Sequence, residues 1–187
     1  MDAGPIWKNC WPILGWEWNW STNATGGVSV DDEARNKLIL GDVMDAVKGG
    51  RSPVVLTERR QHLHLLVEAL EPRVANLIAL HGGMGAKHRR EIAARLLAIP
   101  ASEERVLVAT GRYLGEGFDD SRLDTLFLAL PISWRGTLAQ YAGRLHRLGE
   151  GKTEVLIYDY ADLEVPVLRR MHERRLRGYR AMGYSAQ

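Results

Sequence analysis

Short apolar runs alternate along the chain, from residue 31 onward, with longer stretches in which apolar residues return every three or four positions. The short runs are typical of buried strands, and the longer stretches are typical of helices with one apolar face. Strands are predicted over 53–57, 75–80, 105–110, 125–130 and 154–159. Helices are predicted from Asp31 or Asp32 to Gly49, around 63–70, and over 86–98, 136–148 and 165–182. Strands that are apolar on both faces and alternate with helices predict a doubly wound α/β domain with a parallel sheet.

The apolar positions also predict which face of each terminal helix packs. In the first helix we expect the buried stripe at Leu40, Val43, Met44 and Val47. In the last helix we expect it at Leu168, Met171, Tyr179 and Met182.

The first 30 residues follow neither pattern. Five of the six tryptophans lie here, at positions 7, 11, 16, 18 and 20, and a segment rich in serine, threonine and glycine follows over 21–27. Tryptophans can stack on nucleic-acid bases or dock on a partner. The missing periodicity favours a poorly ordered arm, or the ragged start of a shortened reading frame. The expected organisation is therefore an arm over 1–30 and one α/β domain over 31–187.

Composition places few limits on function. The formal net charge of +2 is too small to indicate nucleic-acid binding, so such a role would depend on where the charges lie. The lone cysteine, Cys10, rules out an internal disulfide and suits a reducing cytoplasm. No apolar run approaches the roughly 18 residues of a membrane-spanning helix, so we expect a cytoplasmic protein without membrane contact.

Polar residues follow several of the predicted strands at the point where each strand ends. They are found at 57–59, 81–83, 110–112 and Asp159. Ligands of open parallel sheets bind beyond the carboxyl ends of the strands. The sequence therefore predicts one polar, glycine-rich edge, where backbone N–H groups and helix N-termini can face phosphates.

The segment Gln140-Tyr-Ala-Gly-Arg-Leu-His-Arg147 stands out among the predicted helices. On a helix, Gln140, Arg144 and Arg147 share one face, and Leu138, Tyr141, Leu145 and Leu148 line another that can pack on the sheet. Gly143 leaves room for another backbone or a ligand. Arginine suits phosphate because its planar guanidinium donates parallel hydrogen bonds and stays charged. A solvated basic helix face is the alternative for these residues taken alone.

This segment resembles the Gln-x-x-Gly-Arg-x-x-Arg motif that closes the second RecA-like domain of superfamily 2 (DEAD/DEAH-like) helicases. Further segments resemble other motifs of that family in the same order: 54–59, 81–85 with Arg89, 106–110 with 115–120, and 123–131. The resemblance covers roughly residues 31 to 184. The sequence of residues 114–149 is most similar to bacterial helicases of defence or restriction systems, which act on DNA.

The resemblance implies roles for individual residues. Arg144 and Arg147 would be arginine fingers that reach the γ-phosphate of ATP on a partner domain, and Gln140 would position that nucleotide. Gly117 and Asp119 would border the ribose or transmit the nucleotide state, and Gly143 would also belong to the nucleotide site. The nucleic-acid backbone, DNA rather than RNA, would be held by Thr57, Arg59, Gly82, Gly83 and Thr110.

A phosphate loop of the form Gly-x₄-Gly-Lys-Ser/Thr is absent from the sequence. The segment 82–87 is a poor imitation, and Asp32 is better interpreted as a helix cap than as part of a magnesium-binding acidic box. We therefore expect a C-terminal motor half whose ATP and Mg²⁺ are held mainly by an N-terminal RecA-like domain, in another chain or a missing segment. The chain alone is not expected to hydrolyse ATP. The alternative is a non-catalytic module, derived from a helicase fragment, that binds nucleic acid or protein.

Other charged residues have less specific interpretations. The histidines at 62, 64, 81 and 88 lack metal-ligand spacing, so we interpret them as surface or core residues. Asp119 and Asp120 fit a polar turn better than an acid/base pair. The last helix carries arginines at 169, 170, 174, 175, 177 and 180. Three roles are open for these arginines: contact with a phosphate backbone, pairing with acidic residues of a missing domain, or simple exposure to solvent.

Overall fold

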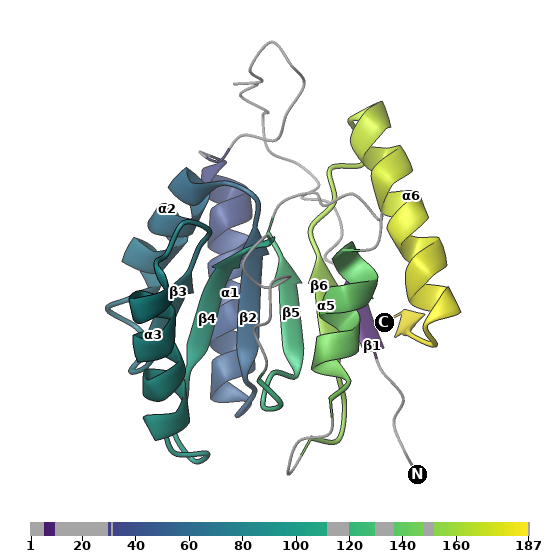
Figure 1. Ribbon diagram of the computed structural model, residues 1–187. Helices are drawn as coiled ribbons and strands as arrows, with labels where there is room; N and C mark the ends of the chain where they lie inside the picture. Colours follow the sequence, from purple (N-terminus) through teal and green to yellow (C-terminus); the bar gives the residue numbers. More distant parts are fainter. Residues whose placement is uncertain are drawn as a thin grey trace.

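Seven strands form a single sheet in the computed structural model of the chain, with helices on both of its faces (Figure 1). The structure describes residues 6–9, 30, 32–111, 120–129, 137–147 and 152–186. The strands are β1 (Ile6–Asn9), β2 (Pro53–Thr57), β3 (Leu77–Leu80), β4 (Val106–Thr110), β5 (Thr125–Leu128), β6 (Leu156–Asp159) and β7 (Ser185–Ala186). Their order is β3-β4-β2-β5-β6-β1-β7, and every pairing is parallel. The predicted α/β fold with a parallel sheet is confirmed.

The helices pack on the two faces of the sheet in separate groups. They are α1 (Glu33–Lys48), α2 (Arg60–Leu70), α3 (Ala86–Ala98), α5 (Thr137–Leu145) and α6 (Pro166–Ala181). Successive side chains of a strand point to opposite faces. In β2, Val54 and Leu56 therefore pack with α3, α5 and α6, whereas Val55 packs with α1 and α2. Both faces of the central strands are covered, which is why those strands are apolar at almost every position.

The first helix begins where the sequence predicted. Asp32 is its N-cap, and the carboxylate of Asp32 accepts a hydrogen bond from the Arg35 N–H at 3.0 Å. This confirms the cap and leaves no reason to read Asp32 as a metal-binding acid. The buried stripe, however, is centred on Ile39 and Val43, while the predicted Leu40 and Met44 are only partly buried. The expected stripe was displaced because Leu40 and Met44 lie at the margin of the contact with the sheet.

The N-terminal segment differs from the prediction at one place. Residues Ile6–Asn9 form β1, which pairs in parallel with β6 and with β7. Four residues are too few to show a strand period, and the hydrogen-bonding edge of β6 supplies the partner that the sequence could not reveal. The tryptophan-rich residues 10–29 lie outside the described residues. Among the described residues, no helix combines the length and the apolar character needed to cross a bilayer.

Candidate nucleotide and nucleic-acid interface

The carboxyl ends of β2, β3 and β4 bring three of the predicted polar segments to one edge. Thr57 pairs in register with Thr110, and Leu80, the last residue of β3, pairs with Ala109. Thr57, Thr110 and the turn at 81–83 are therefore neighbours along one edge of the sheet. The parallel strand order produces this grouping, as the strand assignments predicted.

The turn after β3 is fastened to both neighbouring elements. The N–H of Gly82 donates to Thr110 Oγ1 at 3.2 Å, and Arg60 in α2 donates to the Gly82 carbonyl at 2.6 Å. Arg60 Nη2 also lies 2.9 Å from His81 Nδ1. Gly83 has a φ of +89°, a conformation that disfavours any side chain. Gly83 and Arg59 are exposed and Gly82 is half-buried, so this part of the edge faces solvent on a fixed backbone.

A buried chain of hydrogen bonds lies behind Thr57. Asn36 Nδ2 donates to the Val30 carbonyl at 2.9 Å, so Asn36 Oδ1 is the acceptor for His62 Nε2 at 2.8 Å. A neutral His62 then carries its proton on Nε2 and accepts the Thr57 hydroxyl at Nδ1, 3.0 Å away. Thr57 has no exposed surface. Its hydroxyl is thus directed into the protein, and the sequence signal for this was only a polar strand end followed five residues later by a histidine.

Tyr141 attaches α5 to the end of β4. Its side chain is buried, and its hydroxyl donates a short hydrogen bond to the Gly111 carbonyl. A Cβ on Gly111 would lie 2.6 Å from Glu58 Oε1 and 2.9 Å from the Tyr141 hydroxyl, so any other residue there would force these groups to shift. Burial and the neighbouring Glu58 raise the pKa of Tyr141 to about 12, against an opposing effect of Arg144. Burial also raises the pKa of Glu58.

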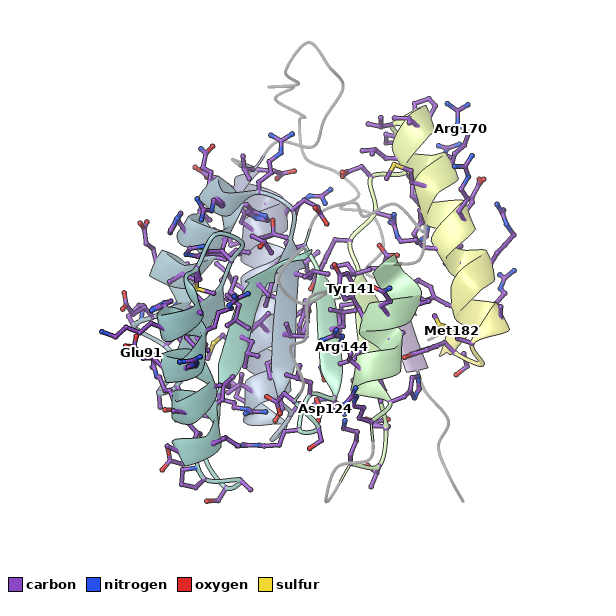
Figure 2. All side chains as sticks on the ribbon, in the orientation of Figure 1. Glu91, Asp124, Tyr141, Arg144, Arg170 and Met182 are labelled. Carbon is purple, nitrogen blue, oxygen red and sulfur yellow. The ribbon has the colours of Figure 1, made fainter. Side chains whose placement is uncertain are left out.

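This helix ends at Leu145, before the predicted end at residue 148, so Gln140 and Arg144 lie on α5 while Arg147 lies in the turn after it. Gln140, Gly143 and Arg147 are exposed and Arg144 is half-buried, while Tyr141 and its neighbours Ala142 and Leu145 are buried. Figure 2 labels Tyr141 and Arg144 on α5 in front of the sheet. A Cβ on Gly143 would meet nothing within 4 Å, so open space lies beside the helix there.

Lys152 closes the carboxyl end of α5. Its Nζ donates to the carbonyls of Leu145 and Arg147, at 2.9 Å each, which satisfies groups that a helix end leaves unpaired. Burial lowers the pKa of Lys152, with an opposing effect of Asp124 and Asp120. Sequence reasoning missed this lysine, because it lies beyond the helix and only the return of the chain toward β6 brings it close.

Two of the predicted nucleotide-binding residues, Gly117 and Asp119, lie outside the described residues. Their neighbour Asp120 is described, and its Oδ1 accepts the N–H of Arg122 at 3.0 Å. Its carboxylate also pairs with the buried Arg105. This arrangement confirms the polar turn expected at Asp120.

Asp159, in contrast, is not available at the sheet edge. The guanidinium of Arg175 in α6 donates to both of its carboxylate oxygens, at 2.7 and 2.8 Å, and the Tyr179 hydroxyl donates to one of them at 3.0 Å. Asp159 and Arg175 are both 1% exposed. The expectation of a ligand-facing Asp159 and of a surface Arg175 was therefore wrong, because each neutralises the other in the core.

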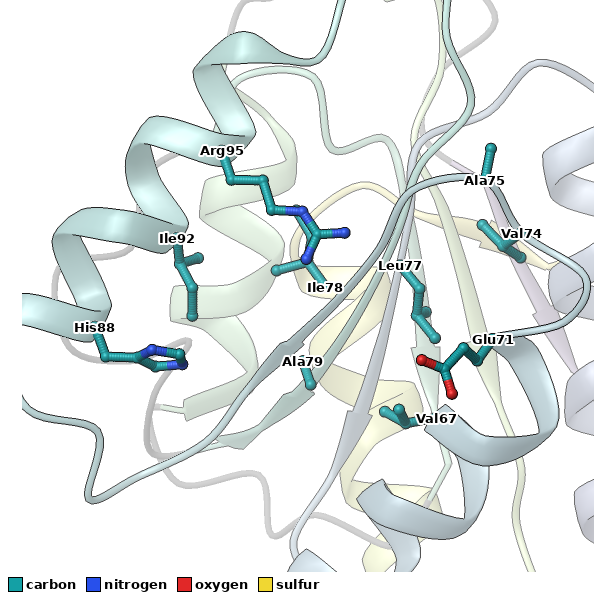
Figure 3. A pocket seen from close by; sticks show the side chains of 10 residues that line it. All are labelled: Val67, Glu71, Val74, Ala75, Leu77, Ile78, Ala79, His88, Ile92 and Arg95. Carbon is teal, nitrogen blue, oxygen red and sulfur yellow. The ribbon is translucent and has the colours of Figure 1, made fainter.

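A groove of about 370 Å³ lies elsewhere, against the edge strand β3 (Figure 3). Arg95 reaches toward it from α3, and Glu71 reaches toward it from the end of α2. Apolar residues of β3 and its neighbours form most of the lining. The predicted site residues do not line this groove, so it is separate from the edge with Thr110 and from α5.

Comparison with known proteins gives a consistent assignment. The family model described as "Helicase conserved C-terminal domain" matches residues 36–149. No curated protein sequence matches the chain.

Solved structures resemble the fold at low sequence identity. UvsW of T4 is 15% identical with a TM-score of 0.64, over 82% of this chain and 34% of that one. The C-terminal part of the Fun30 ATPase domain is 14% identical with a TM-score of 0.65, over 77% and 45%. A variant of Dbp5 from S. cerevisiae, bound to RNA and ADP BeF3, is 13% identical with a TM-score of 0.64, over 100% and 42%. The chain thus spans between about a third and about half of these proteins.

Proposed function

Because this chain belongs to the helicase conserved C-terminal domain family, we propose that it is the C-terminal motor domain of an ATP-dependent DNA helicase or translocase. It acts beside an N-terminal RecA-like domain, which belongs to another chain or to a segment outside this sequence. The observation that carries the proposal is that Gln140 and Arg147 are exposed and Arg144 is half-buried beside the buried Tyr141, on α5 and in the turn that follows it.

In this proposal Arg144 and Arg147 are arginine fingers for ATP bound on the partner domain. Phosphoryl transfer requires little covalent assistance, so positioned positive charge supplies much of the catalysis. The guanidiniums of the half-buried Arg144 and of the exposed Arg147 suit the terminal phosphates, and Gln140 adds an amide that orients the nucleotide. Gly143 leaves open space for a close approach. An arginine finger is worth about 10³–10⁵ in rate, or roughly 4–7 kcal/mol of barrier.

The remaining nucleotide contacts divide between the two domains. Gly117 and Asp119 border the ribose in this proposal. Within the described part of the chain, no three acidic, histidine or cysteine side chains are grouped to hold a metal ion. The partner domain with its phosphate loop is proposed to hold ATP and Mg²⁺.

A nucleic-acid strand is proposed to run along the carboxyl edge of β2, β3 and β4. Arg59, Gly82, Gly83 and Thr110 are proposed to supply the contacts, and the support for this is that Arg59 and Gly83 are exposed beside the half-buried Gly82, whose backbone is fixed by Thr110 and Arg60. Thr57 acts from behind, since its hydroxyl is committed to His62. We propose DNA as the nucleic acid, and a role in defence or restriction, because the sequence of residues 114–149 resembles bacterial helicases of such systems. Because the similar Dbp5 structure is bound to RNA, both nucleic acids belong in the test.

The first test is ATP hydrolysis. The purified chain, with or without single-stranded DNA, is expected to hydrolyse no ATP. Combined with a phosphate-loop domain encoded beside it, it should form a nucleic-acid-stimulated ATPase. Arg147→Ala should lower that rate by about 10³-fold or more, because the transition-state charge loses a donor.

The matched control is Lys37→Ala, an exposed residue of α1 on the other face of the sheet. It should leave the rate unchanged. A rate for Arg147→Ala within a few-fold of the parent enzyme contradicts the finger assignment, as does ATP turnover by the chain alone.

The absent phosphate loop favours one second candidate, a non-catalytic module that binds nucleic acid or protein. That function predicts binding with no ATPase in any combination of domains. Hydrolysis that requires both the partner domain and Arg147 excludes it.

A further inference from the structure

The solvent face of α6 carries a straight row of arginines that the proposed motor function does not use. The buried side of the helix contains Leu168, His172, Arg175 and Tyr179. Arg170, Arg174 and Arg177 lie on the opposite side at i, i+4 and i+7, and all three are exposed. We call these three residues the α6 arginine row. At 1.5 Å per residue they span about 10 Å of helix axis.

Buried contacts fix the direction in which this row faces. The pair of hydrogen bonds from Arg175 to Asp159 and the bond from the Tyr179 hydroxyl hold α6 against β6 in one rotation. At the start of the helix, Arg169 Nε donates to the Leu163 carbonyl at 2.6 Å. The row is therefore a preorganised surface, and its position does not depend on the conformation of a loop.

The positive charge of the row is not neutralised by the described part of the chain. No hydrogen bond or ion pair joins Arg170, Arg174 or Arg177 to any described residue. Glu173 lies three residues after Arg170 and four before Arg177 on α6, so it is a helical neighbour of both. One carboxylate beside three guanidiniums leaves this face with a net positive charge, which an anionic partner would stabilise.

We propose that the α6 arginine row binds the phosphate backbone of a double-stranded nucleic acid. The inference rests on the proposed function, in which a single strand lies along the sheet edge, and it adds a place for the adjoining duplex. Figure 2 shows Arg170 at the end of α6 that follows the carboxyl end of β6, on the side where the strands end. The row therefore begins on the same side of the sheet as the carboxyl ends of the strands, where the single strand is proposed to lie.

Two further observations favour a duplex over a single strand. Duplex DNA presents about one charge per 1.7 Å of axis, roughly twice the density of one strand, so a row of about 10 Å meets more phosphates. Proteins that hold single strands stack bases on aromatic side chains. The aromatic residues of the α6 region, Tyr179 and Tyr184, are both buried.

The test compares two variants of the full chain that lose the same charge. The first is Arg170→Gln/Arg174→Gln/Arg177→Gln. The control is Lys37→Gln/Lys48→Gln/Arg73→Gln, three exposed residues of α1 and of the turn after α2. Both should keep the parent circular dichroism and melting temperature, because every altered side chain is exposed. Binding to a short blunt duplex and to a single strand is measured by fluorescence anisotropy across a salt series.

For the row variant we expect duplex affinity to fall at least ~10-fold and the salt slope to become shallower by about 0.9 for each lost DNA contact. Affinity for the single strand should change by less than ~3-fold, and the control should lose less than ~3-fold on either ligand. Equal losses in the two variants would mean that only net charge matters, and would overturn the proposal. An unchanged duplex affinity, or a larger loss on the single strand, would overturn it too.

Two additional measurements identify which nucleic acid the row binds and whether the row acts independently of the sheet edge. A duplex of RNA beside one of DNA shows which backbone the row accepts, and loss on either supports the proposal. Arg59→Ala, at the sheet edge, should weaken the single strand and spare the duplex. If the single strand does not bind at all while the duplex loss remains, the proposed motor function fails and the α6 arginine row stands.

Discussion

At the scale of single residues, two glycines of the candidate site differ in whether the surrounding atoms leave room for a side chain. Gly111 follows β4 at the point where Glu58 and Tyr141 meet, and the space for a Cβ is already filled by their oxygens. Gly143 has the same residue type and the opposite surroundings, since no described atom outside its own helix backbone lies within 4 Å of a Cβ placed there. A side chain at Gly111 would therefore displace Glu58 and Tyr141, whereas one at Gly143 would displace only a ligand that came close.

This contrast predicts different outcomes for the same substitution. Gly111→Ala should lower the free energy of unfolding by about 1–3 kcal/mol, because the added methyl group separates Tyr141 from the Gly111 carbonyl. Gly143→Ala should raise it by up to about 1 kcal/mol, because alanine favours a helix interior. Urea unfolding of both variants measures the difference. If Gly143→Ala also lowers the reconstituted ATPase rate, the open space beside α5 is used by the nucleotide; equal stability of the two variants would contradict this account of Gly111.

At the scale of elements, the helices that carry arginines are held by different means. Tyr141 and Lys152 attach α5 at its middle and at its end, through backbone carbonyls. The α6 helix is held through Asp159, whose carboxylate receives both Arg175 and Tyr179. The ends of α5 and α6 also meet where His146 packs edge-on against Tyr184, with ring centroids 5.3 Å apart.

The buried pair predicts a large asymmetry between single and double substitutions. Arg175→Leu leaves the Asp159 carboxylate buried with only the Tyr179 hydroxyl, and should cost about 3–5 kcal/mol of stability. The double variant Arg175→Leu/Asp159→Leu removes both charges, and it should recover most of that loss. Chemical denaturation measures the free energy of unfolding of the two variants and so tests this expectation. A double variant no more stable than Arg175→Leu would show that Asp159 does more than neutralise the arginine.

At the scale of the whole molecule, the parallel sheet separates three surfaces. The first is the carboxyl edge of β2, β3 and β4, which carries the turn at 81–83. The second is formed by α5 and α6, which cover one face of the sheet beside β5 and β6 (Figure 1). The groove beside β3 lies apart from both. Substitutions in one surface should therefore leave the others intact.

Salt dependence tests this separation at the sheet edge. Arg59→Ala should weaken single-strand binding and make its salt slope shallower by about 0.7, the value for one phosphate contact to a single strand. The substitution removes an exposed side chain, so the melting temperature should not change. Binding that does not depend on salt would remove the backbone-tracking role from this edge.

Much of the fold followed from local patterns in the sequence. The bounds of α3 are those predicted, Asp32 caps α1 as predicted, and the central strands lie where apolar runs ended in polar residues. These features depend on neighbours within a few positions along the chain, which periodicity and capping residues reveal. The shared helix of Gln140 and Arg144 also followed from the spacing, but Arg147 lies beyond the end of α5 at Leu145, which the spacing did not predict.

The sequence by itself therefore determined the fold class, the grouping of polar residues at one sheet edge and the polar face of α5. Only the tertiary structure decided which arginines of α6 face solvent. The sequence of the helix does not show that Arg175, unlike the other arginines, pairs with a buried carboxylate. Arg175 lies 16 residues from Asp159, Tyr141 lies 30 from Gly111, and His62 lies 26 from Asn36. Each of these pairs joins different elements, and only packing the elements on the sheet brings their polar atoms within hydrogen-bonding distance.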